Sequence, residues 1–280
     1  MKLSQDIPKL TLSFLLICTA IISSAIRGNS QSLAILEEAA REAAINFVPI
    51  EAQNSDEPPE DNTVGTDHDG TRGDCVATAI PLTRLMGHRS PSLYLTTNPH
   101  PTFWFYVPYQ PDQVTSGIFS LQDPAGSTEY WRTRFHFPET ASKSVPGIVS
   151  VTLPQTEDPL DPDFIYQWFF EFDCPKPDSS DERTSPASIN GQVQRVEVTP
   201  ELEAQLNAAN NSVEQAEIYA QEGLWYDVIT EVGKLYLDNP QSEAIGELWQ
   251  NLLQDIGLDR VSTEPMIGPV ETLNPEDPSE

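Results

Sequence analysis

The chain has 280 residues, and its 43 aspartates and glutamates outnumber its 15 lysines and arginines, giving a net charge of −28. Phosphate backbones and anionic membrane surfaces repel such a protein, which argues against nucleic-acid binding. Apolar residues make up 38% of the chain, enough for a folded core, and its 25 prolines favour turns and short strands over a helical bundle.

Residues 1–25 have the pattern of a signal peptide. Lys2 and Lys9 precede the apolar run 10–22, and Ser23, Ser24 and Ala25 supply small residues for cleavage after Ala25. As a helix the run spans about 20 Å, whereas a bilayer core is about 30 Å thick. We expect an exported protein, periplasmic or secreted, with no stable membrane span after cleavage. An uncleaved signal anchor is the alternative.

Residues 26–72 predict a short helix followed by a disordered acidic linker. Ser32 can cap the helix, behind which apolar residues recur at helical spacing: Leu33, Leu36, Ala40, Ala43 and Phe47. The segment 51–62 is acidic and rich in proline, a composition typical of flexible linkers. The helix can dock on the rest of the protein or remain mobile.

Residues 73–199 predict a mainly β domain. Short apolar or alternating runs are separated by turn signals rich in Pro, Asn and Asp, and they fall at 92–97, 102–109, 116–122, 129–137, 147–153, 164–173 and 192–198. Successive strands without intervening helices indicate an antiparallel β-sandwich, which we expect to be immunoglobulin-like.

Residues 200–260 change to a helical period. Pro200 is suited to a helix start, and further helices are expected at about 211–222, 224–237 and 242–256. One pair matches a tetratricopeptide-like hairpin in the relative positions of Ala216, Tyr219, Gly223, Trp225 and Pro240. Residues 262–280 carry five acids, no base and four prolines, so we expect a disordered acidic tail over residues 261–280.

Two cysteines remain once the signal, with Cys18, has been removed. In an oxidising compartment Cys75 and Cys174 are expected to form a disulfide. A closed loop of about 100 residues contributes roughly 4 to 5 kcal/mol in the chain-entropy model. Two free, buried thiols are the alternative.

Motifs for catalysis or cofactor binding are missing from the sequence. It contains no G-x-S-x-G, H-E-x-x-H, P-loop or G-x-G-x-x-G, so we predict neither an enzyme nor a cofactor. His68 lies in an acidic loop, and four acids at 157, 158, 161 and 163 could offer oxygens to Ca²⁺, but their spacing does not match an EF-hand. Solvated loops are the favoured interpretation of both, and no metal site is predicted.

The segment 129–137 carries the most basic strand. Alternation places one set of side chains on a common face: Tyr130, Arg132, Arg134 and His136. The two arginines could bind a carboxylated ligand or an acidic partner. Pairing with the protein's own carboxylates across neighbouring strands is the alternative, and we favour it.

The segment 102–109 has aromatic residues on both faces of a strand. Phe103 and Phe105 would fill the core, leaving Trp104 and Tyr106 as an exposed platform for a sugar ring or a protein. A central strand buried on both sides explains the same residues without a ligand, and this alternative is the stronger one.

Several strings resemble the cyanobacterial Domain of Unknown Function 928 family: Thr71–Cys75, Pro101–Tyr109, Gly147–Pro154, Tyr166–Trp168, Gly191–Val196 and Tyr219–Asp227. The resemblance covers about residues 71–260 and implies an exported cyanobacterial protein, but no activity or site residues. The chain departs from the family at 66–70, where a Gly/Arg-rich segment is expected, and at 175–188, where a compact turn is expected.

Together these features predict a non-catalytic, exported envelope protein that mediates protein–protein interaction. The alternative is a carbohydrate-binding module of the cell envelope that uses Trp104, Tyr106 or Trp131. An envelope protein or a glycan is the expected partner.

Overall fold

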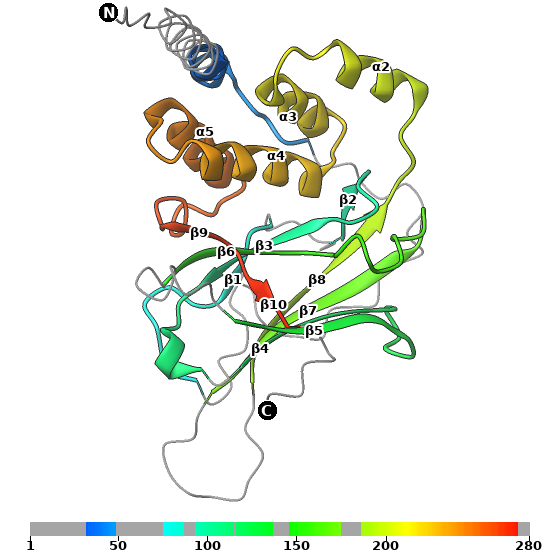
Figure 1. Ribbon diagram of the computed structural model, residues 1–280, viewed down its shortest axis with the longest axis vertical. Coiled ribbons are helices and arrows are strands. Elements are labelled where there is room, and N and C mark those ends of the chain that lie inside the picture. The colour runs from blue at the N-terminus through cyan, green and yellow to red at the C-terminus, as the bar shows by residue number, and fades with distance from the viewer. Residues whose placement is uncertain are drawn as a thin grey trace, which may run out of the picture.

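Two β-sheets and a layer of helices form the described part of the chain (Figure 1). The computed structural model describes residues 32–48, 75–86, 93–114, 116–136, 146–174 and 186–273. Several predicted features lie outside these ranges: the signal at 1–25, the linker from residue 49, His68 and the tail from residue 274. The two departures from the family also lie outside them, except for residues 186–188.

One sheet has four strands and the other has six. The four-stranded sheet has the order β1 (Thr83–Arg84), β3 (Thr102–Val107), β6 (Gly147–Thr152) and β9 (Met266–Pro269). The six-stranded sheet has the order β10 (Glu271–Thr272), β5 (Glu129–His136), β4 (Ser116–Gln122), β7 (Ile165–Asp173), β8 (Ala187–Arg195) and β2 (Leu93–Thr96). A short 3₁₀ helix, η1 (Pro111–Gln113), lies between β3 and β4.

Aromatic side chains fill the space between the two sheets. Along β7, buried residues alternate with half-buried ones, as the period of two in its sequence predicts. Phe170 from β7 stacks on Phe105 from β3 with ring centroids 3.9 Å apart, and Phe103 packs on Phe119 from β4 at 4.9 Å. The predicted β-rich, two-sheet architecture with C-terminal helices is therefore confirmed.

The prediction of purely antiparallel sheets is wrong. β2 pairs with β8 in parallel, and β9 pairs with β6 in parallel. Parallel neighbours need long connections, which are supplied here by the intervening strands and, before β9, by the helices. Turn signals and alternation predict where a strand lies but not its direction relative to a neighbour that is distant in sequence.

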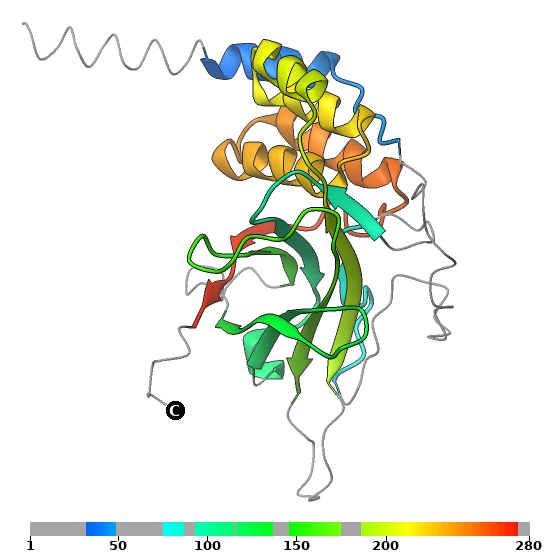
Figure 2. The ribbon, with the colours of Figure 1, turned by 90° about the vertical axis from the view of Figure 1, so that its right-hand side faces the viewer.

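Four helices follow β8: α2 (Pro200–Ala208), α3 (Ser212–Gln221), α4 (Trp225–Asp238) and α5 (Glu243–Asp255). Thr199 caps α2 by accepting a hydrogen bond from the Leu202 amide, and Asn211 caps α3 in the same way. Figure 2 shows the helices gathered on one side of the sheets, where α4 contacts β2 and β3. Among the described residues, every helix is too short or too polar to span a bilayer.

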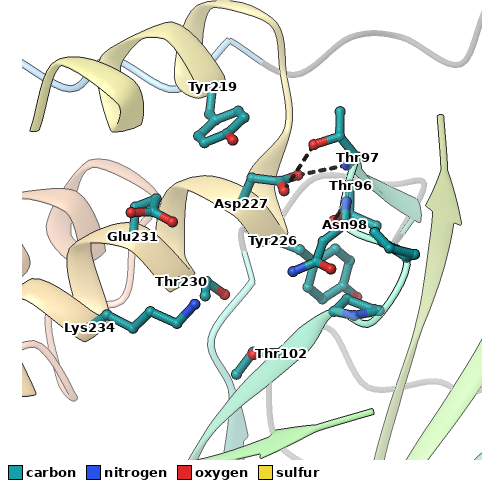
Figure 3. A pocket seen from close by; sticks show the side chains of 12 residues that line it. Thr96, Thr97, Asn98, Thr102, Tyr219, Tyr226, Asp227, Thr230, Glu231 and Lys234 are labelled. Atoms are coloured by element: carbon teal, nitrogen blue, oxygen red, sulfur yellow. Dashed lines mark hydrogen bonds between the residues drawn. The ribbon is translucent and has the colours of Figure 1, made fainter. Parts of the chain in front are cut away.

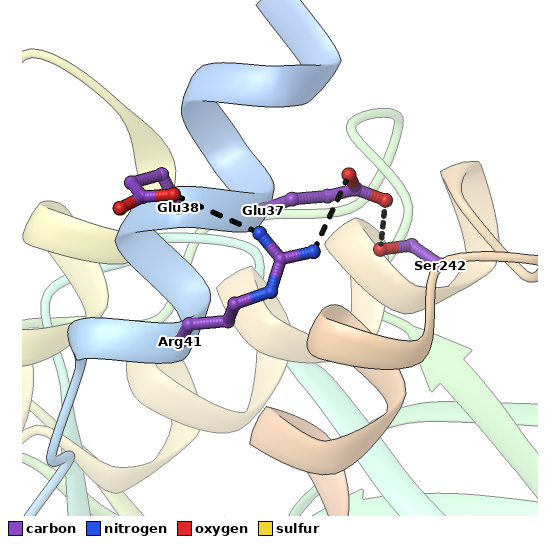
Figure 4. A network of polar contacts seen from close by, with 4 residues as sticks. All are labelled: Glu37, Glu38, Arg41 and Ser242. Carbon is purple, nitrogen blue, oxygen red and sulfur yellow. Dashed lines mark hydrogen bonds and ion pairs between the residues drawn. The ribbon is translucent and has the colours of Figure 1, made fainter.

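The helix over residues 32–42 is docked on this layer. Glu37 accepts a hydrogen bond from Ser242 Oγ at 2.8 Å and also lies 3.8 Å from Arg41, which pairs with Glu38 as well (Figure 4). Beyond the helix, Phe47 packs edge-on against Trp225 with ring centroids 5.0 Å apart. Of the two alternatives for this predicted helix, the docked one holds.

The prediction that the tail is disordered from residue 261 is wrong for residues 261–273. β9 pairs with β6, and β10 pairs with β5, so this segment crosses from one sheet to the other (red in Figure 1). A short apolar run, Met266 to Val270, is enough to extend both sheets at their edges, and Val270 is buried. The prediction missed this run because it averaged the composition over the whole tail, which is acidic and rich in proline.

The predicted disulfide is confirmed. Cys75 and Cys174 are bonded, with their Cα atoms 5.1 Å apart and 99 residues apart in sequence. The bond joins the segment before β1 to the end of β7.

Candidate functional site

The predicted aromatic platform on β3 is wrong, because both side chains are buried. Trp104 and Tyr106 are each only 4% exposed. Trp104 donates a hydrogen bond from Nε1 to Thr230 Oγ1 of α4 at 3.2 Å, and its ring lies against Trp249 of α5. The helices cover the outer face of the four-stranded sheet, so the alternative of a strand buried on both sides holds.

The basic row on β5 is exposed, as its alternation predicts. Arg132, Arg134 and His136 point outward between the buried residues of the same strand. Arg132 Nη1 lies 3.2 Å from Glu129 Oε2, an exposed pair of the kind worth at most about 1 kcal/mol. Arg132 therefore pairs with one of the protein's own carboxylates, but within β5 and not across neighbouring strands as the favoured alternative predicts.

Tyr130 does not belong to that row, because a β-bulge displaces it. On β4, Leu121 pairs with Trp131 and Gln122 pairs with Glu129, so Tyr130 is an extra residue between the two pairs. Its ring lies 4.9 Å from the ring of Tyr166, which is buried at the start of β7. The bulge thus turns an aromatic side chain toward the opening between the sheets.

At this opening lies a cleft of about 310 Å³, which we call the aromatic cleft. It is lined by Leu121, Tyr130, Trp131, Leu153, Glu157, Asp158, Pro159, Leu160, Asp161 and Tyr166. Tyr130, Trp131 and Tyr166 form its aromatic wall, and the loop of residues 154–163, the acidic loop, supplies the lining residues from Glu157 to Asp161. Apolar surface combined with a few polar groups is typical of small-ligand sites.

The aromatic wall is exposed enough to meet a ligand. Tyr130 is 44% exposed, and the neighbouring Phe164 is 38% exposed. The rings of Tyr130, Phe164 and Tyr166 meet edge-to-face with centroids 4.8 to 5.8 Å apart. Such mutual packing holds the rings in place before any ligand arrives. Trp131, a residue of the predicted carbohydrate site, lies at the base of this wall and is 8% exposed.

Contacts to its backbone fix the acidic loop. Leu160 donates its amide to Pro99 O at 2.9 Å, and Leu160 O accepts from Arg195 Nη1 at 2.9 Å. The Asp161 amide donates to the Tyr166 hydroxyl at 3.0 Å, and His100 Nε2 lies 3.1 Å from Glu157 O. Burial raises the pKa of Tyr166, so the hydroxyl remains protonated at neutral pH. The loop is therefore held without using its carboxylates.

Three residues with carboxylate side chains line the cleft, and in the described part of the chain none of these carboxylates forms an ion pair. Glu157, Asp158 and Asp161 belong to the lining, which contains no lysine, arginine or histidine. Among the described residues, the ion pairs involve other groups, namely those of Arg41 and Arg132. The cleft is accordingly electronegative and offers hydrogen-bond acceptors beside aromatic rings.

A second, polar pocket of about 190 Å³ lies where α3 and α4 meet the segment after β2 (Figure 3). Its central residue, Asp227, is 8% exposed and accepts hydrogen bonds from the Thr97 amide at 2.9 Å and the Thr97 hydroxyl at 3.2 Å. Burial raises the pKa of Asp227 to about 6 and that of Tyr219 to about 12. These contacts join the helical layer to the β2–β3 connection, so we interpret the pocket as a structural junction.

The sequence pointed to only part of the aromatic cleft. The sequence contains Trp131 and the acidic loop as separate features, and nothing in it places them together. Simple alternation predicts an outward-facing Tyr130, because it cannot detect a bulge. In the described ranges, no three acidic, histidine or cysteine side chains are grouped closely enough to hold a metal ion.

Comparison with known proteins shows that the chain is similar to a described family. The family described as Domain of Unknown Function (DUF928) matches residues 67–266. No curated protein matches the sequence.

Proposed function

The chain belongs to the DUF928 family, and on that premise we propose that it is an exported, non-catalytic envelope protein that binds a saccharide in the aromatic cleft. The observation that carries this proposal is a cleft lined by the exposed ring of Tyr130, two further aromatic residues and the acceptor-bearing residues of the acidic loop. Sugar rings present apolar C–H faces and polar edges, and such a cleft complements both.

Export and a cyanobacterial source remain part of the proposal. The apolar run at 10–22 with its basic start supports export, and the disulfide between Cys75 and Cys174 is consistent with an oxidising compartment. An immunoglobulin-like class for the sandwich and a tetratricopeptide-like pairing of α3 with α4 are also proposals. They are supported by the facing sheets and by the close contact of these two helices.

Substitution of Tyr130 tests the saccharide proposal. In calorimetric titrations with neutral, amino and acidic oligosaccharides, we expect the wild-type chain to bind at least one class. Tyr130→Ala should weaken that binding about tenfold, because the exposed ring that contacts the sugar is lost. The bound oligosaccharide should be recovered intact, as the non-catalytic part of the proposal requires.

Two variants control this experiment. Tyr130→Phe retains the ring and should retain most of the affinity. Val198→Ala truncates a side chain that is 45% exposed and does not belong to the cleft lining, so it should bind as wild type does. If Tyr130→Ala binds as tightly as wild type, the saccharide does not occupy the cleft.

The basic row on β5 supports a second candidate function, contact with an acidic envelope protein. Arg132 and Arg134 present two cationic groups on an exposed strand, with His136 beside them, in a chain with net charge −28. Such a local reversal of charge can steer an acidic partner. Cross-linking in periplasmic extract, with wild type and with Arg132→Gln/Arg134→Gln, tests this function. A partner protein that is captured by wild type and not by the variant supports it. Equal capture of that protein by both contradicts it.

A further inference from the structure

The polarity of the aromatic cleft restricts the saccharide that it can accept. Every charged side chain in the lining is a carboxylate, namely Glu157, Asp158 and Asp161. Uronic or sulfated sugars would bring further negative charge to this wall and would be repelled. A protonated amine on the sugar would instead find carboxylate residues and aromatic rings in the same lining.

The carboxylates are available for such an amine. Hydrogen bonds to the backbone of Leu160, Asp161 and Glu157 hold the acidic loop in place. Among the residues that the structure describes, no lysine, arginine or histidine is within ion-pair distance of the three carboxylates. Asp158 and Asp161 are exposed and Glu157 is half-buried, so a ligand can reach them without rearrangement of the loop.

The aromatic wall adds a second attraction for a cation. A positive charge over the face of a tyrosine or tryptophan ring is stabilised by the ring quadrupole when it lies within about 6 Å of the centroid. Tyr130 and Trp131 line the same cleft as three carboxylate residues of the acidic loop. A cationic sugar would therefore be attracted by both the carboxylates and the rings, whereas a neutral sugar would use mainly the rings.

From this charge distribution we infer that the saccharide carries protonated amino groups, as in oligosaccharides of 2-amino-2-deoxyglucose. The inference rests on the proposed saccharide function and specifies the chemical class of ligand for the same cleft. The positive charge is placed between the carboxylates of the acidic loop and the rings of Tyr130 and Trp131.

Titration with three oligosaccharides of equal length tests the inference. The probes are a glucosamine trisaccharide, its N-acetylated form, which has no charge, and a galacturonate trisaccharide. Just below neutral pH and at low salt, wild type should bind the glucosamine form about tenfold more tightly than the N-acetylated form, and the galacturonate form more weakly than both. The preference should shrink in 0.5 M NaCl, where exposed charges are screened.

Matched variants separate the cleft from the general acidity of the chain. Asp158→Asn/Asp161→Asn should remove the preference for the amine while leaving binding of the N-acetylated form nearly unchanged. Glu247→Gln, an exposed site on α5, should retain the preference. Circular dichroism before each titration shows whether a variant is folded.

The outcomes distinguish the inference from the function on which it rests. Equal binding of the amino and N-acetylated forms, with both weakened by Tyr130→Ala, would overturn the inference and leave the saccharide proposal standing. No binding of any of the three forms would contradict both. A preference for the amine that survives both Tyr130→Ala and Asp158→Asn/Asp161→Asn would show attraction to the chain's overall charge and would also overturn the inference.

Discussion

Asp227 shows how one buried carboxyl group can join two layers of the structure. It lies in the first turn of α4, and its oxygens accept hydrogen bonds from the amide and hydroxyl of Thr97, beyond the end of β2. Burial penalises its charged form and raises its pKa from 3.8 to about 6. The native state therefore binds this proton more tightly than the unfolded chain does.

This difference predicts a pH dependence of stability. The stabilisation by protonation is fully present below pH 3.8 and is lost as the pH rises through about 6. Between pH 5 and pH 7, the free energy of unfolding of wild type should fall by about 1 kcal/mol relative to Asp227→Asn, which has no proton to lose. Urea unfolding of both proteins at the two pH values measures the change, and parallel pH profiles would contradict it.

The packing of α4 on the four-stranded sheet depends on a glycine. A Cβ atom added at Gly233 would lie 2.7 Å from Cζ2 of Trp104, a distance that requires the indole or the helix to move. At Gly246 in α5, the nearest atom would be 3.6 Å away, which is an ordinary contact. A methyl group therefore clashes at Gly233 and fits at Gly246.

We therefore predict opposite effects of the same substitution. Gly233→Ala should lower the free energy of unfolding by about 1 to 3 kcal/mol because of overpacking against Trp104. Gly246→Ala should leave stability unchanged or raise it by up to about 1 kcal/mol, because alanine favours helix. Chemical unfolding of both variants measures this, and a stable Gly233→Ala protein would contradict the close packing.

At the scale of helices and strands, the sequence predicts where each element lies better than which strands pair with one another. The helices expected at about 211–222, 224–237 and 242–256 closely match α3, α4 and α5, because their apolar periods and end signals are local. The parallel partners of β2 and β9 depend on packing between segments far apart in the chain. The bulge at Tyr130 likewise appears only when β4 and β5 are paired.

Considered as a whole molecule, the protein has aromatic residues with two different roles. Trp104, Trp225 and Trp249 are buried where the helices meet the sheets, and they join these layers into one hydrophobic core. Tyr130 and Trp131 instead line the aromatic cleft together with residues of the acidic loop. Composition alone cannot separate the two roles, because coverage by the helices decides which rings remain accessible.

The charge of the molecule also differs between its surfaces. The net charge of −28 argues against polyanionic partners for the chain as a whole. The three carboxylate residues of the cleft argue against anionic ligands at that site. The basic row on β5 is the exception, and it lies on the outer face of the six-stranded sheet. A ligand in the cleft and an acidic partner on the sheet would therefore use separate surfaces.

The most direct test of the central claim is the nitrogen–proton NMR spectrum of the indole groups during a saccharide titration. The chain has five tryptophans, of which Trp131 lines the aromatic cleft. The glucosamine trisaccharide should shift the Trp131 indole signal in wild type, leave the buried Trp104 and Trp249 signals in place, and shift Trp131 much less in Tyr130→Ala. Saturable binding with an unchanged Trp131 signal would place the ligand elsewhere and contradict the account.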